Sequence, residues 1–377
     1  MQPGYPAARI VAPTVVEHLA MHLQAAQSGG LRTLAPQPGV EEIETLIDAG
    51  FWASLQREEG RAPKISLAYL PPEAAGHAMV FARPLSLNAR DLSKLAPAVE
   101  RPGIHLGVWQ DRGVLRVWGT GRSVPTNTLV LEVVEPGLLV LKYRRGDEFD
   151  KFGTIAVLQG DRVQVVDEAG DSLPDCPALL SSLLGFDAPA PAAGPTSVLI
   201  QLAISMRAHG RGGSLIVVPS GSDAWQESSA QPIPYSVAPY DDLAGLLRAD
   251  EDARARPAWR EAFRRSVDAV AGLTAVDGAT VMNECDELLA FGVKLVRRRG
   301  SERVEKVAVT APVVGNRAAV VDPSALGGTR HLSAAQFVHD QRDALAMVAS
   351  QDGRFTVFAW SPCEDMVHAH RVETLLM

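Results

Sequence analysis

The sequence predicts a chain of mixed α and β structure in two domains. The first is an N-terminal α+β domain with an antiparallel sheet, and the second is an α+β or α/β domain with a mixed sheet flanked by helices. Strand-like segments fill most of the first half, whereas helical and strand-like segments alternate in the second half. Residues 187–195 combine repeated proline with alanine and glycine, which is typical of an extended linker. We therefore expect domains over residues 1–186 and 196–377, since 377 residues is long for a single domain.

The N-terminal domain is expected to contain a helix around residues 18–22 and another over residues 40–55, followed by a series of strands. Over residues 40–55, apolar side chains recur at the spacing of one helical face, at Ile43, Leu46, Ile47 and Phe51. Shorter strand-like segments follow at residues 65–69, 78–81, 104–109, 114–118, 128–134, 137–143, 155–158 and 163–166. Turn residues between neighbouring segments indicate that the strands pair in an antiparallel sheet.

The C-terminal domain is expected to alternate helices with buried strands. Apolar residues at helical spacing predict two helices, with Val198, Leu199, Leu202, Ala203 and Met206 in the first and Trp259, Phe263, Val267 and Val270 in the second. Pro257 suits the first turn of the second helix. Short apolar runs predict strands at residues 214–219, 279–282, 288–295 and 307–309. This order predicts a mixed sheet covered by helices.

The charge, apolar runs and cysteines of the chain argue against several classes of function. The net charge of -8 argues against an extended nucleic-acid-binding surface, although a local basic pocket could hold a small anion. No run approaches the roughly 20 apolar residues that cross a bilayer, and the N-terminus lacks the pattern of a signal peptide. Cys176, Cys285 and Cys363 are too far apart in sequence for a paired metal or disulfide motif. We expect a cytoplasmic protein that binds neither nucleic acid nor membrane.

The tripeptide Asp277-Gly278-Ala279 places a carboxylate where a helix ends and an apolar strand begins. Functional groups are commonly presented at such boundaries, and a glycine lets another group approach the backbone closely. Asp-Gly is equally a turn signal, and by itself the tripeptide is more typical of a turn.

The segment Gly327-Gly328-Thr329-Arg330-His331 is more informative. The glycines permit a tight turn, Thr329 is expected to cap a helix, and the following residues continue as that helix. A helix N-terminus with a guanidinium and an imidazole favours a bound anion. We therefore expect a phosphate site here, while a glycine-rich helix start with two solvated polar residues remains the alternative.

Residues 344–360 predict a β-hairpin. Asp352-Gly353 lies between two apolar runs, and this dipeptide is typical of a type I′ turn. Asp352 is thus first a turn residue and secondly a candidate metal ligand. A hard cation such as Mg²⁺ would take oxygen ligands, which Asp277 and Asp352 could share with phosphate oxygens.

In this order, the three motifs resemble the diadenylate cyclase family, and the resemblance spans about residues 196–362. In that family, two domains face each other, each holds ATP, and each ribose 3′ hydroxyl attacks the other α-phosphate to give cyclic di-AMP. The resemblance implies that Asp277 contacts the ribose and a Mg or Mn ion. It implies a nucleotide site made of Asp277, Gly278, Ala279, Leu295, Gly328, Thr329, Arg330, His331 and Ser350. An active cyclase would also need to form a homodimer.

The chain departs from the active cyclases at two of these motifs. Leu332 stands where they have a second arginine, in Gly-Thr-Arg-His-Arg, so one phosphate-binding charge is absent. Ser350-Gln351-Asp352 replaces Ser-Glu-Glu, so one carboxylate becomes an amide and the other is shorter. The pattern is similar to a divergent branch named DACNV, proposed as a nucleotide sensor, and we place that resemblance on residues 196–377.

The sequence therefore predicts a sensor that binds an adenine nucleotide or cyclic dinucleotide without turnover, with Mg or Mn as the only expected cofactor. Loss of transition-state charge impairs catalysis more directly than it impairs ground-state binding. Two alternatives stay open: an active diadenylate cyclase that uses Asp277 catalytically, and a scaffold that keeps the fold for protein contacts alone.

Overall fold

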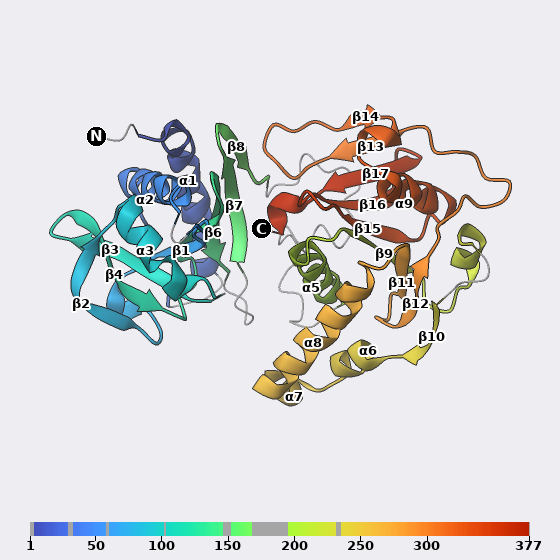
Figure 1. Ribbon diagram of the computed structural model, residues 1–377, viewed down its shortest axis with the longest axis horizontal. Coiled ribbons are helices and arrows are strands. Elements are labelled where there is room, and N and C mark those ends of the chain that lie inside the picture. The colour runs from blue at the N-terminus through green and yellow to red at the C-terminus, as the bar shows by residue number, and fades with distance from the viewer. Residues whose placement is uncertain are drawn as a thin grey trace. The chain divides into compact units, whose positions relative to one another are not determined.

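The computed structural model divides the chain into two compact units, Met1–Val166 and Asp167–Met377 (Figure 1). The structure describes residues 4–28, 33–57, 60–101, 103–145, 152–167, 195–230 and 235–376. Most of the predicted linker, residues 187–194, lies outside the described residues, and Pro195 already begins a helix.

The first unit combines helices with one eight-stranded sheet. Its described helices are α1 (Pro6–Ser28), α2 (Val40–Ser54), α3 (Ala89–Val99) and the short 3-10 helix η1 (Pro72–Ala74). Its strands are β1 (Ile65–Tyr69), β2 (Met79–Ser86), β3 (His105–Asp111), β4 (Val114–Gly121), β5 (Leu129–Glu135), β6 (Leu138–Arg144), β7 (Phe152–Gln159) and β8 (Arg162–Val165). The predicted helix over residues 40–55 corresponds to α2, and each predicted strand overlaps one of β1 to β8.

The sheet of the first unit has the strand order β2-β4-β3-β1-β5-β6-β7-β8. Adjacent strands in this sheet pair antiparallel, as predicted, except that β1 and β3 run parallel. A parallel pair needs a long connection to bring the chain back to the same end of the sheet, and α3 lies within the connection between β1 and β3. The sheet is therefore mixed, with a central parallel pair.

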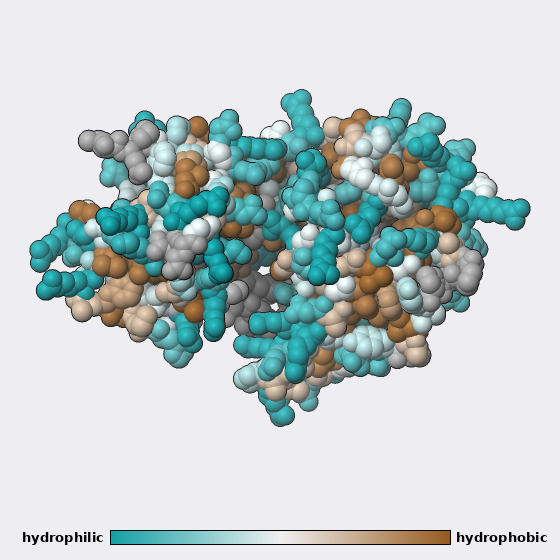
Figure 2. All heavy atoms as spheres, viewed as in Figure 1, coloured by the Kyte–Doolittle hydropathy of each residue, from teal (hydrophilic) through white to brown (hydrophobic). Residues whose placement is uncertain are grey.

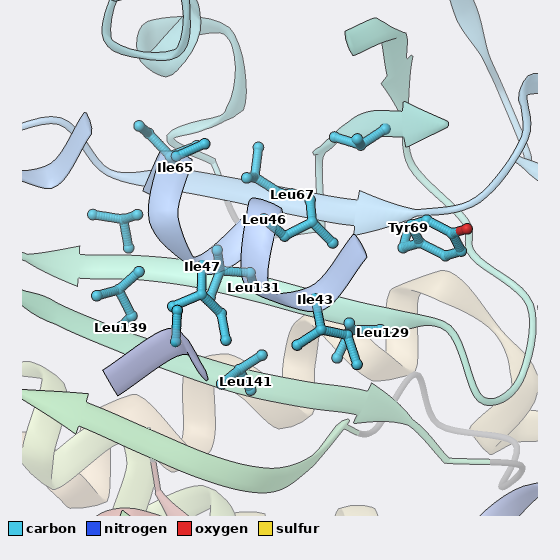
Figure 3. Packing of buried hydrophobic residues seen from close by; sticks show 14 of the residues in the cluster. Ile43, Leu46, Ile47, Ile65, Leu67, Tyr69, Leu129, Leu131, Leu139 and Leu141 are labelled. Atoms are coloured by element: carbon cyan, nitrogen blue, oxygen red, sulfur yellow. The ribbon is translucent and has the colours of Figure 1, made fainter. Parts of the chain in front are cut away.

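The main core of this unit lies between α2 and the sheet, as Figure 3 shows. Ile43, Leu46 and Ile47 project from α2 toward apolar side chains of β1, β5 and β6, and all three are almost completely buried. Their partners on the strands include Ile65, Leu67, Leu129, Leu131, Leu139 and Leu141. The helical spacing read from the sequence thus marks the face of α2 that covers the sheet.

The second unit contains a nine-stranded sheet and further helices. Its described helices are α5 (Pro195–Ala208), α6 (Asp242–Leu247), α7 (Glu251–Ala255), α8 (Pro257–Leu273) and α9 (Thr329–Asp340), with 3-10 helices η2 (Ala224–Ser228), η3 (Pro323–Ala325) and η4 (Glu373–Leu375). Its strands are β9 (Gly213–Val218), β10 (Tyr235–Tyr240), β11 (Ala279–Asn283), β12 (Leu288–Val293), β13 (Val307–Thr310), β14 (Ala319–Val321), β15 (Leu345–Ala349), β16 (Phe355–Ser361) and β17 (Met366–Arg371).

The strand order of the second sheet is β10-β12-β11-β9-β15-β16-β17-β13-β14. The pairs β9/β11 and β13/β17 are parallel and the others antiparallel, which confirms the predicted mixed sheet. The helices α6 to α8 lie within the connection between the parallel strands β9 and β11, which also contains β10.

Helices cover both faces of this sheet. On one face, α5 and α8 pack against strand residues such as Leu215 and Val217, and on the other face α9 packs over Ile216 and Val218. These alternating residues of β9 are all buried, which explains why the strand reads as a continuous apolar run. Figure 1 shows α9 lying over β15, β16 and β17.

The apolar residues of the two cores contrast with the outer surface. On the face drawn in Figure 2, hydrophilic residues predominate and hydrophobic residues form scattered patches. Within the described ranges, no helix has both the length and the apolar character needed to cross a membrane.

Candidate functional site

A cavity of about 480 Å³ lies at one edge of the second sheet, beside the first turn of α9. It is lined by Ser214, Asp277, Gly278, Ala279, Val293, Lys294, Leu295, Gly328, Thr329, Arg330, His331, Ser333, Val348, Ala349, Ser350 and Gln351. Its size lies within the usual range for small-molecule sites, about 300–1,000 Å³.

Strand direction explains why segments far apart in sequence meet at this edge. The parallel strands β9 and β11 both begin here, and their residues Ser214 and Ala279 line the cavity. The strands β12 and β15 run antiparallel to these neighbours, so their ends, at Val293 and Ala349, lie at the same edge. Figure 1 shows β15, β9, β11 and β12 as neighbours in the sheet, with α9 nearby.

The structure brings together the residues of the predicted nucleotide site. Asp277, Gly278, Ala279, Leu295, Gly328, Thr329, Arg330, His331 and Ser350 all lie along this cavity. Asp352, the second candidate metal ligand, is not among the lining residues. The predicted site did not include Lys294, although its position at the end of an apolar strand was an available signal. It also did not include Gln351, which was noted only as an amide in place of a carboxylate.

The Asp277 carboxylate is paired with the Lys294 ammonium. Lys294 Nζ donates to Asp277 Oδ2 over 2.5 Å, and both side chains remain largely exposed, at 56% and 88%. The hydrogen bond and charge of Lys294 lower the pKa of the Asp277 carboxyl, and Arg330 adds a smaller effect of the same sign. Asp277 is therefore ionised at neutral pH and lies close to two cations.

Gly278 has a structural role beside its place in the cavity. Its φ of +112° lies in the region that favours glycine, and a β-carbon there would stand 2.5 Å from the carbonyl carbon of Gly292. The close approach predicted for this glycine thus involves the backbone of β12. It allows the chain to place Asp277 and Lys294 side by side at the ends of two neighbouring strands.

The first turn of α9 differs from the predicted one. Gly328, not Thr329, is the N-cap residue, and no side chain caps the helix. Thr329 is instead the first helical residue, and its side chain is exposed along the cavity. The prediction of a Thr329 cap was wrong because the extended conformation falls one residue earlier, at Gly328. The positive end of the α9 dipole therefore faces the cavity without a capping side chain.

His331 is held in a neutral state. The ring is buried and lies edge-on to Phe358, with 6.1 Å between the two ring centroids. Its Nδ1 lies close to Gly327, because a β-carbon built on Gly327 would stand 2.6 Å from it. Burial lowers the pKa of His331, and the positive charges of Arg371 and Arg354 act in the same direction, while Asp352 opposes them. His331 can donate or accept a hydrogen bond at neutral pH but brings no positive charge.

The turn between β15 and β16 is not the predicted type I′ turn. That turn requires left-handed backbone at both central residues, yet only Gly353 has a positive φ, of +83°. The Gly353 N–H donates to the Ser350 carbonyl over 3.2 Å, so the turn spans residues 350–353 and glycine follows its central pair. Asp352 Oδ2 forms a salt bridge with Arg354 Nε over 3.2 Å. The Gln351 side-chain amide donates a hydrogen bond to the Arg211 carbonyl over 3.3 Å.

These residues do not fit a divalent cation held by the protein. Among the described residues, no three His, Cys, Asp or Glu side chains are grouped so as to hold a metal ion. Asp277 is the only carboxylate among the residues that line the cavity, and Lys294 already offsets its charge. Mg²⁺ prefers several oxygen ligands in octahedral geometry, which the lining side chains do not supply.

The comparison with family models finds one match. Residues 32–122 match the family described as "Probable sensor domain DACNV", and this match is consistent with a sensor role. The matched residues lie within the first unit, whereas the sequence analysis placed this resemblance on residues 196–377. This match does not extend to the second unit.

No curated protein matches the chain. Among solved structures, the chain is similar to one described as "The crystal structure of the hypothetical membrane spanning protein from Bacillus cereus". The identity is 15%, the TM-score is 0.27, and the similarity covers 51% of this chain and 70% of the other.

Proposed function

We propose that the second unit binds an adenine nucleotide or cyclic dinucleotide in the cavity beside α9, and that the protein senses this ligand without converting it. The observation that carries the proposal is the convergence of three separate motifs, at residues 277–279, 328–331 and 350–351, on one cavity. The match of residues 32–122 to a sensor family supports the sensing role.

The cavity combines groups suited to a nucleotide. Arg330 and the first turn of α9 offer donors for phosphate oxygens, and the neutral His331 offers one more polar contact. The exposed Asp277 carboxylate can accept hydrogen bonds from ribose hydroxyls, while the half-buried Leu295 gives an apolar contact for a base.

Two features favour binding over turnover. Joining two nucleotides places extra negative charge on the reacting phosphate, which a catalyst must stabilise more strongly than it stabilises the substrate. Here Leu332 brings no charge to α9, and Gln351 is an amide whose side chain bonds to the Arg211 carbonyl. The site thus retains charges for binding but few groups for the reaction.

Isothermal titration calorimetry on the full chain tests the proposal with ATP, AMP and cyclic di-AMP. We expect saturable binding of at least one of them and a loss of about ten-fold or more in Arg330→Ala, because charge-assisted hydrogen bonds are removed. Arg264→Ala, an exposed arginine on α8 away from the cavity, should bind as the parent chain does.

Mass spectrometry after incubation with ATP and Mg²⁺ or Mn²⁺ tests the absence of turnover. We expect no cyclic di-AMP. Product formation that Asp277→Asn abolishes would instead establish a cyclase. No binding of any of the three nucleotides, together with unchanged thermal stability, would favour a scaffold role, because a ligand specific for the folded state must stabilise it.

A further inference from the structure

We infer that Lys294 is a built-in counter-ion in place of a divalent metal, and that the cavity consequently selects a single phosphate group on its nucleotide, bound without metal, over a triphosphate. This inference rests on the proposed function, since it specifies the ligand of that same cavity. Two sources carry such a phosphate: the diester of a cyclic dinucleotide and a nucleoside 5′-monophosphate.

The position of Lys294 is the first observation. Its ammonium group lies 2.5 Å from Asp277 Oδ2, on the carboxylate that a metal would need. A divalent cation bound to that carboxylate would be repelled by the ammonium or would have to displace it. Both side chains line the cavity, so the ammonium can contact a phosphate while it stays near Asp277.

The charge balance of the cavity is the second observation. Among the lining residues, Lys294 and Arg330 are cationic and Asp277 is anionic, which leaves one net positive charge. The α9 N-terminus adds about half a positive charge. The two diesters of a cyclic dinucleotide carry about two negative charges in total and a monophosphate carries about 1.5 to 2, so either ligand is close to balance. A triphosphate without its metal would bring a large excess of negative charge.

The neighbouring acidic residue does not change this balance. Asp352 lies outside the lining residues and is paired with Arg354 over 3.2 Å. Gln351, which does line the cavity, has an amide with no charge to hold a cation. A metal delivered with the nucleotide would therefore find only Asp277 as a carboxylate ligand in this cavity.

Calorimetry on the full chain tests the inference with cyclic di-AMP, AMP and ATP, each with EDTA or with excess magnesium chloride. We expect cyclic di-AMP or AMP to bind with a Kd that differs by less than about two-fold between the two conditions. ATP should bind about ten-fold more weakly or worse in both. The relative affinities of cyclic di-AMP and AMP identify which source the site prefers.

Variants of Lys294 separate its charge from its shape. Lys294→Met should weaken binding in EDTA by about ten-fold or more, and Lys294→Arg should restore most of the affinity. Lys306→Met is the matched control, because Lys306 is exposed and does not line the cavity. Its affinity should be unchanged, and circular dichroism should show that every variant is folded.

The outcomes separate this inference from the proposed function. Binding that requires Mg²⁺, tightest binding by ATP, or an unchanged affinity in Lys294→Met would overturn the inference while leaving nucleotide binding in place. The absence of binding by all three nucleotides in both conditions would overturn both.

Discussion

Gly212 and Arg330 lie so close together that a β-carbon built on Gly212 would stand 2.9 Å from Arg330 Nη1. Gly212 also has a φ of +71°, in the left-handed region that glycine adopts most readily. The turn before β9 thus packs against the guanidinium of Arg330, although the two residues are far apart in sequence.

Gly212→Ala should therefore damage both stability and binding. The left-handed backbone should cost about 1 kcal/mol of folding free energy. The displaced guanidinium should weaken nucleotide binding by about ten-fold. Urea denaturation and calorimetry measure the two effects. Gly221→Ala is the matched control, since Gly221 has a φ of +74° but no atom within 4 Å of the added carbon. Gly221→Ala should lose stability but keep its affinity for the nucleotide. An equal loss of affinity in both variants would contradict the proposed role of the contact between Gly212 and Arg330.

Asp286 makes the stability of the second unit depend on pH. Burial raises the pKa of its carboxyl from 3.8 to about 7, so the folded state binds this proton more tightly than the unfolded chain does. The contribution of this group to stability therefore falls as pH rises from about 3.8 to about 7 and is constant above that.

Asp286→Asn should consequently stabilise the protein more at about pH 7.5 than at about pH 4.5. Asparagine also tolerates the φ of +62° at this position, so the substitution adds little backbone strain. The midpoint of urea denaturation at the two pH values measures the gain. Asp252→Asn, on an exposed residue of α7, should show no comparable difference. An equal gain at both pH values would rule out the ionisation of Asp286 as the cause.

Two apolar residues of α5 should respond differently to truncation. Leu202 is fully buried in the core, whereas Ile204 is 41% exposed on the same helix. Leu202→Ala should lower the free energy of unfolding by about 2–5 kcal/mol, because it removes packed atoms and leaves a cavity. Ile204→Ala should change it by about 0.5 kcal/mol or less. Denaturation followed by far-UV circular dichroism gives both values, and similar losses would contradict the packing of α5 described above.

Asn127 joins the first helix to the sheet of the N-terminal unit. It is buried, has a φ of +65°, and its side-chain amide donates to the Leu19 carbonyl over 3.0 Å. Asn127→Gly should remove the hydrogen bond and cost about 1 kcal/mol. Asn127→Ala should cost about 1 kcal/mol more, because alanine is strained at positive φ. Urea denaturation of the two variants compares these effects. An alanine variant as stable as the glycine variant would show that the backbone conformation is unimportant here.

Much of the fold could be predicted because its signals are local. Ile43, Leu46 and Ile47 mark the buried face of α2 by their spacing alone, and Pro257 marks the start of α8. Strand pairing is not local, so the parallel pair β1/β3 within the first sheet could not be read from the sequence. The α3 helix was not predicted, although Asn88 caps it: Asn88 Oδ1 accepts a hydrogen bond from the Asp91 N–H over 2.9 Å.

The candidate site could be predicted in part for the same reason. Asp277, Arg330 and Ser350 lie in short motifs that the sequence displays directly. The prediction of a type I′ turn at Asp352-Gly353 was wrong. A favourable dipeptide does not fix the number of residues that the neighbouring strands leave for the loop. The predicted cap at Thr329 was wrong by one residue, because Gly328 is the N-cap. The backbone conformation that defines a cap depends on the preceding turn.

The sequence by itself singled out three candidate polar groups: a carboxylate at Asp277, a guanidinium at Arg330 and an imidazole at His331. Only the tertiary structure decided their state. It paired Asp277 with Lys294, placed Arg330 against Gly212 and buried His331 so that the ring stays neutral. Charge and hydrogen bonding depend on distances between segments that lie far apart along the chain, and folding alone sets those distances.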